Sequence, residues 1–390
     1  MPNTIPWEQR KLGELATFSK GCGYSKSDLR DSGYPIILYG RLYTQYETEI
    51  TEVDTFIEND INAIKSYGNE VIVPASGETS EEITRASAVG KKGIVIGGDL
   101  NIIRPKQGIS TVFLALSISN GDLQKNLSKK AQGKSVVHIR NDDLKEVILK
   151  YPSYEEQTQI GNFFKQLDDT IALHQRTLEK YQKLKISYLE KMFPKENELY
   201  PELRFPNFTD AWEQRKLGEC FNERTERSSI GELISVTMNS GVIKASDLDR
   251  KDNSSKDKSN YKKVEIGDIA YNSMRMWQGS SGESTFRGIL SPAYTVLIPN
   301  KDISSTFFSY YFKLERMLEI FKVNSQGLTS DTWNLKYPTI AKIVVSVPTL
   351  KEQIQIGNFF KQLDDTIALH QREVKKYKKI KQSYLEKMFI

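Results

Sequence analysis

The sequence contains few residues of the types that build metal sites and disulfide frameworks. Its 390 residues include only two cysteines, Cys22 and Cys220, and three histidines, His138, His174 and His370. Two cysteines can neither staple a chain of this length nor form a zinc site unaided, so a cytoplasmic location is expected. Two of the histidines fall on the seams of the long helices predicted below, so the sequence predicts no metal centre.

Long apolar runs and familiar catalytic motifs are also missing. No apolar run approaches the roughly 20 residues of a membrane span, and the N-terminus does not resemble a signal peptide. An adenine methyltransferase needs an Asn/Asp-Pro-Pro-aromatic loop, and the sequence contains no Pro-Pro pair. Gly133-Lys134-Ser135 looks like the end of a phosphate-binding loop, but Ser128 occupies the position of its first glycine. These absences indicate that the chain supplies no chemistry of its own.

An internal repeat organises the chain, and a repeat is informative about architecture before any single motif. The string WEQRKLGE occurs at Trp7–Glu14 and at Trp212–Glu219. The string IGNFFKQLDDTIALHQR occurs at Ile160–Arg176 and at Ile356–Arg372, and SYLEKMF follows in both copies. Between these anchors the two halves differ, so variable and constant blocks alternate along the chain.

Each constant block is predicted to form one long helix. Ser153–Glu156 and Thr349–Glu352 both fit the S/T-x-x-E capping box directly after a proline. Seam residues then recur at steps of four and three over more than four heptads, which favours a coiled coil. We expect the two helices to pair antiparallel, with His174 and His370 meeting near the middle. The predicted helix-pairing residues are Ile160, Phe164, Leu167, Ile171 and His174 in the first copy and Ile356, Phe360, Leu363, Ile367 and His370 in the second.

The variable blocks carry the signals of compact α/β domains. Short β-branched runs separated by Gly-Asp and Ser-Gly pairs indicate strands, and helices are predicted at Val112–Leu116 and Thr306–Phe321. The expected fold class is α+β: two α/β domains joined by two long helices in an antiparallel coiled coil, with a pseudo-two-fold internal repeat. The predicted strands are Tyr34–Tyr39, Glu70–Pro74, Gly93–Ile96, Asn101–Pro105, Val264–Tyr271, Tyr294–Pro299 and Ile343–Pro348.

Two unlike domains, each followed by a near-identical helix, resemble the specificity subunit of type I restriction–modification systems. The resemblance covers essentially the whole chain and includes a Pro-x-x-x-Glu-Gln opening at Pro152 and Pro348. The WEQRKL and GNFFKQLDDTIALHQR strings are similar to the family's shared regions, and Gly267–Gly279 and Ser291–Pro299 are similar to its target-recognition domains. The resemblance implies a non-catalytic DNA-recognition subunit in which each domain reads one half of a split DNA sequence.

The resemblance also implies partners, whereas the boundaries follow from the repeat and the predicted helix ends. Two modification subunits dock on the spacer helices, restriction subunits join outside them, and no membrane is involved. S-adenosylmethionine, ATP and Mg²⁺ are expected in the partner subunits and no cofactor in this chain. The expected boundaries are 1–151 for target-recognition domain 1, 152–193 for spacer helix 1, 194–211 for a connector, 212–347 for target-recognition domain 2 and 348–390 for spacer helix 2.

The repeat pattern supports the same function independently of the resemblance. A constant block should contact identical partners, whereas divergent blocks should contact something that differs, such as two DNA half-sites. Three alternatives remain: an old duplication with one drifting copy, a coiled-coil scaffold with two protein-binding heads, and a stand-alone enzyme with an unfamiliar site. Residues 1–151 carry 19 basic and 19 acidic side chains and residues 212–347 carry 19 and 16. Since neither block is a strong phosphate binder, we expect partner subunits to close around the duplex.

Candidate DNA-contacting loops mix the side chains that read base edges and phosphates. Asn272–Gln278 follows a predicted strand, while Gln132–Ser135 and Gln326–Ser330 precede the last strand of their blocks. The structural alternatives are a loop whose Trp277 and Met276 fill the core with Arg275 in a surface ion pair, and solvated turns elsewhere. The predicted DNA-binding residues are Tyr39, Arg41, Tyr43, Lys91, Lys92, Lys134 and Ser135 in the first block and Asn239, Asn272, Arg275, Trp277, Gln278, Gln326, Thr329 and Ser330 in the second.

Overall fold

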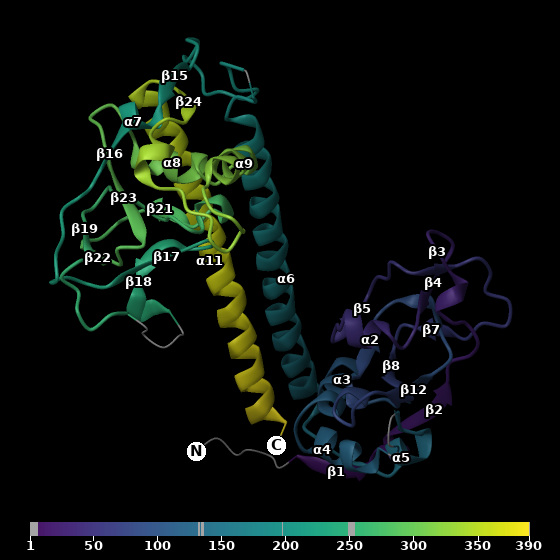
Figure 1. Ribbon diagram of the computed structural model, residues 1–390. Helices are drawn as coiled ribbons and strands as arrows, with labels where there is room; N and C mark the ends of the chain where they lie inside the picture. Colours follow the sequence, from purple (N-terminus) through teal and green to yellow (C-terminus); the bar gives the residue numbers. More distant parts are fainter. Residues whose placement is uncertain (1–6, 132, 134–135, 197, 249–253, 390) are drawn as a thin grey trace. The chain divides into compact units, whose positions relative to one another are not determined.

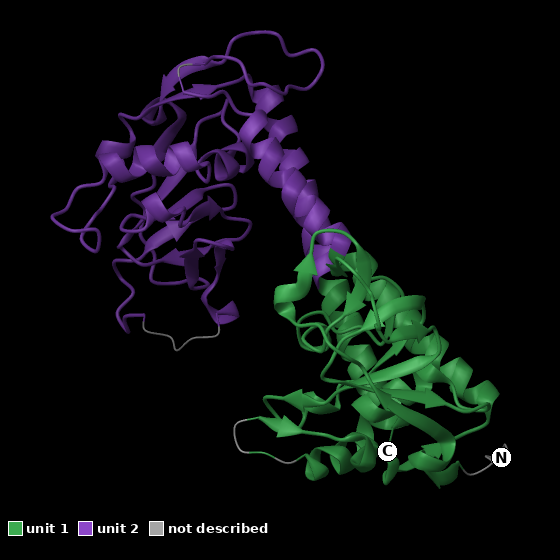
Figure 2. Cartoon of the chain, turned by 90° about the vertical axis from the view of Figure 1, so that its right-hand side faces the viewer, with its two compact units in different colours: residues 1–175, 372–390 green, residues 176–371 purple. Residues whose placement is uncertain are grey.

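The computed structural model describes residues 7–131, 133, 136–196, 198–248 and 254–389. The chain divides into two compact units (Figure 2), unit 1 with residues 1–175 and 372–390 and unit 2 with residues 176–371. The division crosses both long helices, so each unit contains a variable block, called its head below, and one part of each helix. Among the described residues no helix is long and apolar enough to cross a membrane.

Two long helices, α6 (Tyr154–Lys191) and α11 (Leu350–Met388), form where the constant blocks predict them (Figure 1). The hydroxyl of Ser153 accepts a hydrogen bond from the backbone N–H of Glu156 at 3.3 Å. This bond satisfies one of the N–H groups that a helix N-terminus leaves without a partner. The predicted capping residue therefore does start α6.

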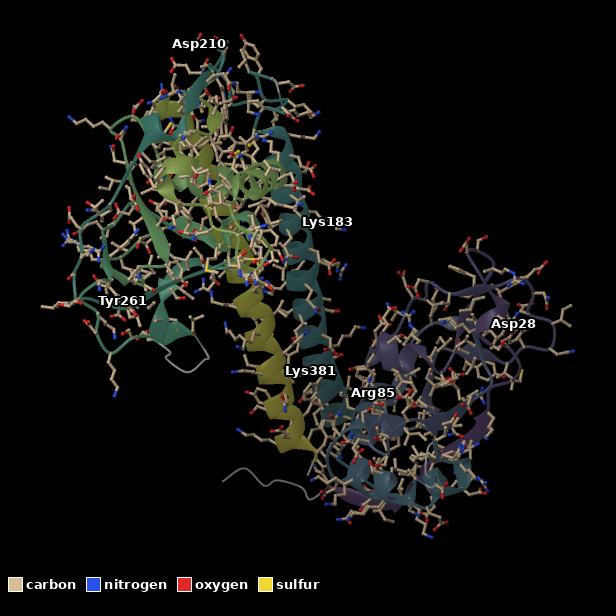
Figure 3. The ribbon with its side chains drawn as sticks, viewed as in Figure 1. Asp28, Arg85, Lys183, Asp210, Tyr261 and Lys381 are labelled. Carbon is tan, nitrogen blue, oxygen red and sulfur yellow. The ribbon has the colours of Figure 1, made fainter. Side chains whose placement is uncertain are left out.

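In unit 1 the first part of α6 runs antiparallel to the last part of α11. Phe163 packs edge-on against Tyr384, with ring centroids 5.0 Å apart. Five residues further along α6, the Asp168 carboxylate accepts a hydrogen bond from the ammonium of Lys381, which Figure 3 labels on α11. The α11 partner number falls as the α6 number rises, which is the signature of an antiparallel pair.

Unit 2 repeats these contacts with the other ends of the same helices. Tyr188 packs edge-on against Phe359 at 5.1 Å, and Lys185 donates to the Asp364 carboxylate. Each of these residues lies 196 positions from its counterpart in unit 1, which is the spacing of the sequence repeat. The predicted antiparallel pairing is confirmed within both units.

The seam residues do more than pair the helices. Ile160, Phe164 and Leu167 belong to the same apolar core as Phe113 of the unit 1 head, so this end of the seam also seats the head. His174 stacks on Tyr377 at 5.7 Å within unit 1. His370 stacks on Tyr181 at 6.1 Å within unit 2, whereas the expected meeting of the two histidines spans the units and stays a prediction. Ile160, Phe164, Leu167, Ile171, Ile356, Phe360 and Leu363 are buried, and His174, Ile367 and His370 are partly exposed.

The described residues of the unit 1 head form two five-stranded sheets and two strand pairs. The sheet orders are β2-β12-β8-β10-β5 and β3-β6-β4-β11-β7, with the pairs β1-β14 and β9-β13. Its elements are β1 (Glu8–Lys11), α1 (Leu12–Leu15), β2 (Ala16–Lys20), η1 (Lys26–Asp28), β3 (Leu29–Arg30), β4 (Tyr34–Ile37), α2 (Arg41–Thr44), β5 (Glu49–Ile50), β6 (Phe56–Ile57), β7 (Lys65–Tyr67), β8 (Glu70–Pro74), β9 (Ser76–Gly77), η2 (Glu82–Thr84), β10 (Ser87–Val89), β11 (Lys92–Ile96), β12 (Leu100–Pro105), α3 (Thr111–Ser119), α4 (Gly121–Lys130), β13 (Val137–His138), α5 (Asn141–Lys145) and β14 (Ile148–Tyr151).

In the part of the unit 2 head that the structure describes, the strands form one four-stranded sheet and three strand pairs. The sheet order is β16-β23-β20-β21, with the pairs β15-β24, β17-β18 and β19-β22. Its elements are β15 (Glu213–Lys216), α7 (Leu217–Cys220), β16 (Phe221–Glu223), β17 (Ile234–Thr237), β18 (Gly241–Lys244), η3 (Ala245–Asp247), β19 (Lys262–Val264), β20 (Ile269–Asn272), η4 (Met276–Gln278), β21 (Ser281–Glu283), β22 (Gly288–Leu290), β23 (Tyr294–Pro299), α8 (Ser305–Tyr311), α9 (Glu315–Asn324), α10 (Tyr337–Ile340) and β24 (Val344–Val347).

The two heads share a core architecture that their unlike sequences did not reveal. The sheet order β2-β12-β8-β10 of unit 1 corresponds to β16-β23-β20-β21 of unit 2. Equivalent strand ends also pair, Ala16 with Pro105 in one head and Phe221 with Pro299 in the other. Both heads are therefore variants of one α/β fold, which confirms the predicted fold class and its internal repeat.

A buried glutamine in each Pro-x-x-x-Glu-Gln motif ties the head to its helix. The Gln157 side-chain amide accepts from the N–H of Ser110 at 2.9 Å and donates to the carbonyls of Pro152 at 2.9 Å and Gly108 at 3.1 Å. Gln353 makes the corresponding three bonds in unit 2. Because buried polar groups require partners, these bonds account for the glutamine at this position of the motif.

Two predicted elements of the second block are each divided in the structure. The predicted strand Val264–Tyr271 becomes β19 and β20, because Gly267 adopts a positive φ of 87° and the Asp268 carboxylate accepts from the N–H of Glu265 at 2.7 Å, forming a turn. The predicted helix Thr306–Phe321 becomes α8 and α9, because Leu314 is extended and serves as the N-cap of α9. Apolar periodicity alone did not reveal either interruption.

Candidate nucleic-acid interface

Two loops of unit 2 that the sequence marks separately form one surface. The N–H of Leu335 donates to the carbonyl of Ser273 at 2.8 Å, which holds the segment after α9 against the loop after β20. The rings of Trp277 and Trp333 pack edge-on with centroids 5.3 Å apart. Tertiary structure therefore brings Asn272–Gln278 beside residues 331–335, which directly follow Gln326–Ser330 in the sequence. We call residues 272–278 together with 326–334 the unit 2 tip.

Arg275 is the exposed cation of the unit 2 tip. Its guanidinium Nη2 lies 3.9 Å from Oδ1 of Asp331, and the two side chains are 40% and 87% exposed. An exposed pair at this distance contributes little free energy. The predicted alternative, a surface ion pair, is thus present, but it leaves the guanidinium available to another partner.

The other predicted residues of unit 2 fall into two groups. The Asn272 side chain accepts from the N–H of Met274 at 3.0 Å and the indole of Trp277 donates to the Met274 carbonyl at 3.2 Å, so both stabilise the loop itself. Gln278 is partly buried beside them. The exposed residues are Asn239, in the turn between β17 and β18, and Gln326, Thr329 and Ser330.

In unit 1, two of the predicted residues already have intramolecular partners. The Arg41 guanidinium is 8% exposed and pairs with Glu47 at 2.9 Å and Asp54 at 2.5 Å. The Tyr43 hydroxyl donates to the Ser76 carbonyl at 2.8 Å, and burial raises the pKa of Tyr43. A DNA contact by either residue would have to replace these bonds, and the assignment of both residues to DNA stays a prediction.

The remaining candidates of unit 1 are exposed or undescribed. Tyr39, Lys91 and Lys92 are exposed. Lys134 and Ser135 lie outside the described residues. Strand β13, which follows these two residues, pairs with β9, the strand after β8. In unit 2 the segment after residues 326–334 likewise bonds to the loop after β20, the strand that corresponds to β8. In the sequence, residues 132–135 and 326–330 thus come just before corresponding parts of the two heads.

Sequence analysis missed three residues of the unit 2 tip. Leu328 is fully exposed at 101%, Asp331 faces Arg275, and Trp333 supports Trp277. Leu328 belongs to a predicted loop but is not a residue type that a search for hydrogen-bonding side chains selects. Among the described residues no three His, Cys, Asp or Glu side chains gather to hold a metal.

Comparison with known proteins identifies the family. A model of the type I restriction modification DNA specificity domain matches residues 4–182 and again residues 209–381. The putative type I restriction enzyme MjaX specificity subunit of Methanocaldococcus jannaschii is 23% identical over 399 residues, covering 97% of this chain and 92% of the relative. The MjaVIII specificity subunit of the same organism is 22% identical over 218 residues, covering 55% and 48%.

A solved structure shares the fold. The type I restriction–modification S subunit from M. genitalium matches with a TM-score of 0.62 at 17% identity, covering 100% of this chain and 98% of that chain. The HsdS subunit from Thermoanaerobacter tengcongensis matches at 15% identity with a TM-score of 0.47, covering 100% and 97%. Since the two family matches together span most of the sequence, this chain belongs to the type I restriction–modification DNA specificity family, the DNA-recognition and not the catalytic component of such systems.

Proposed function

We propose that each head of this specificity subunit reads one half of a bipartite double-stranded DNA site and that the helices dock two modification subunits. The observation that carries the proposal is that two heads share one core architecture and that each is followed by a helix of near-identical sequence. Two heads that share a core architecture but differ in surface residues suit two different half-sites. Near-identical helices suit two copies of one partner.

The chemistry is assigned to the partners. Modification subunits would supply methyl transfer from S-adenosylmethionine, and restriction subunits would supply ATP- and Mg²⁺-dependent cleavage in the cytoplasm. The chain's own residues would bind DNA and position those subunits. Membership of the family favours this reading over a scaffold with protein-binding heads.

The purified chain alone is expected to show no methyl transfer, DNA cleavage or ATP hydrolysis. Methylation should appear when modification subunits are added, and cleavage only with restriction subunits as well. The measurement is transfer of labelled methyl groups from S-adenosylmethionine to duplex DNA, with and without partners. Methyl transfer by the lone chain would refute the assignment, and a full complex that is not retained on DNA would favour the scaffold.

Arg275→Ala is expected to weaken binding by about 1–3 kcal/mol if the guanidinium contacts a guanine edge. Specificity should relax only in the half-site read by unit 2, because unit 1 is unchanged. The measurement is competition binding of the chain with its modification subunits against sites mutated base by base. Arg287→Ala, which removes an exposed arginine paired with Glu265, is the matched control. Uniform weakening on every sequence would reassign Arg275 to a phosphate.

A further inference from the structure

The segment Gln326–Asn334 of the unit 2 tip is closed by paired backbone bonds. The N–H of Gln326 donates to the carbonyl of Asn334 at 3.1 Å, and the N–H of Asn334 donates back at 2.9 Å. Within the segment the Thr332 hydroxyl accepts from the N–H of Thr329 at 3.1 Å and donates to its carbonyl at 2.9 Å. These bonds hold the loop in one conformation.

Residue 327, which precedes the exposed Leu328, must be glycine for the loop to close in this way. Gly327 has a φ of 155°, and a Cβ at this position would lie 2.6 Å from the carbonyl oxygen of Thr332. Leu328 follows with its whole side chain in solvent. A single exposed leucine is ordinary on a protein surface, but this one lies in a loop that backbone bonds between Gln326 and Asn334 close.

The surroundings of Leu328 fit a DNA groove. Gln326, Thr329 and Ser330 flank it with exposed hydrogen-bonding side chains of the kind that contact base edges. The Gln326–Asn334 bridge closes the loop. The major groove, about 12 Å wide, admits two backbone segments side by side, whereas the minor groove is only about 6 Å wide. The apolar group that bases present there is the 5-methyl group of thymine. A loop already held in shape loses little conformational entropy on binding.

We propose that Leu328 is a specificity-determining residue that packs against the 5-methyl group of a thymine in the half-site read by unit 2. The inference rests on the proposed function, in which this head reads half of a bipartite site. Leu328 would supply the apolar contact while its neighbours bond to adjacent base edges. The half-site of unit 2 must then contain at least one A·T pair.

The test replaces each thymine of that half-site by deoxyuridine, which removes only the methyl group. Binding is measured by fluorescence anisotropy with the chain assembled with its modification subunits, after the site has been mapped by methylation. For the wild-type chain, deoxyuridine at one of these positions should lower the affinity about fourfold, because roughly one buried carbon is lost. Leu328→Ala should bind the thymine site about tenfold more weakly and be indifferent to deoxyuridine at that position.

Val323→Ala is the matched control, because Val323 is also apolar and 70% exposed in unit 2. The Val323→Ala variant should keep the wild-type affinity and the fourfold loss of affinity that deoxyuridine causes. Three results would overturn the proposal. The half-site could contain only G·C pairs, the Leu328→Ala complex could still lose affinity when deoxyuridine replaces thymine, or Leu328→Ala could leave the affinity for the thymine site unchanged. Failure of the proposed function is distinguishable, because then the wild-type complex would show no bipartite site at all.

Discussion

Phe389→Ala is expected to destabilise unit 1 by about 3–5 kcal/mol, the usual cost of truncating a buried phenylalanine. Phe389 is 5% exposed, and its ring lies 5.7 Å from Phe113 and 6.1 Å from Phe164. Its carbonyl also accepts from the N–H of Asp122 at 3.1 Å. The substitution would leave a cavity in the core that the N-terminal head shares with the end of α11.

The measurement for Phe389→Ala is hydrogen exchange followed by peptide. Protection should fall throughout residues 7–175, although the substitution is at the other end of the chain. Phe193→Ala is the matched control, since Phe193 is the repeat equivalent in unit 2 and packs 5.3 Å from Phe307. It should lower protection in unit 2 instead. Equal loss in both units from either variant would mean that the two cores unfold as one.

Arg204→Ala is expected to destabilise unit 2 by about 3–5 kcal/mol, because it leaves a buried carboxylate without its counter-charge. Glu352 is fully buried, and its two oxygens accept from Nε and Nη2 of Arg204 at 2.7 and 2.8 Å. These bonds raise the pKa of Arg204. Lysine cannot replace the two parallel bonds, so Arg204→Lys should recover only part of the loss.

Chemical denaturation monitored in unit 2 would measure the Arg204 effect. Glu156→Gln provides the control, because Glu156 is the repeat equivalent of Glu352 in unit 1 but is exposed, and its loss should cost little. Arg204→Met combined with Glu352→Leu should be less destabilising than Arg204→Ala, since no charge is then left buried. A mild effect of Arg204→Ala alone would show that water reaches Glu352.

The unit 2 tip shows how much of the candidate site can be predicted from the sequence. Residue type and position predict loops 272–278 and 326–330 as DNA contacts. The structure places the first loop beside Trp333 and Leu335, which follow the second loop in the sequence. Arg41 and Arg275 are both predicted to contact DNA, and each follows a predicted strand. Their exposures of 8% and 40% depend on which carboxylates the folded chain places nearby, which no local pattern encodes.

Sequence by itself determined the two long helices, because helix periodicity and capping are local properties of the chain. It also determined the repeat, which is read directly from the duplicated strings and predicted the antiparallel pairing that the contacts of both units confirm. It also located strands such as β8 and β23, whose apolar runs end at prolines. Only the tertiary structure decided that the heads share one core architecture and that Phe389 completes the core of unit 1. The reason is physical: a core requires buried apolar volume and satisfied backbone bonds, which unlike sequences and distant segments of the chain can supply equally well.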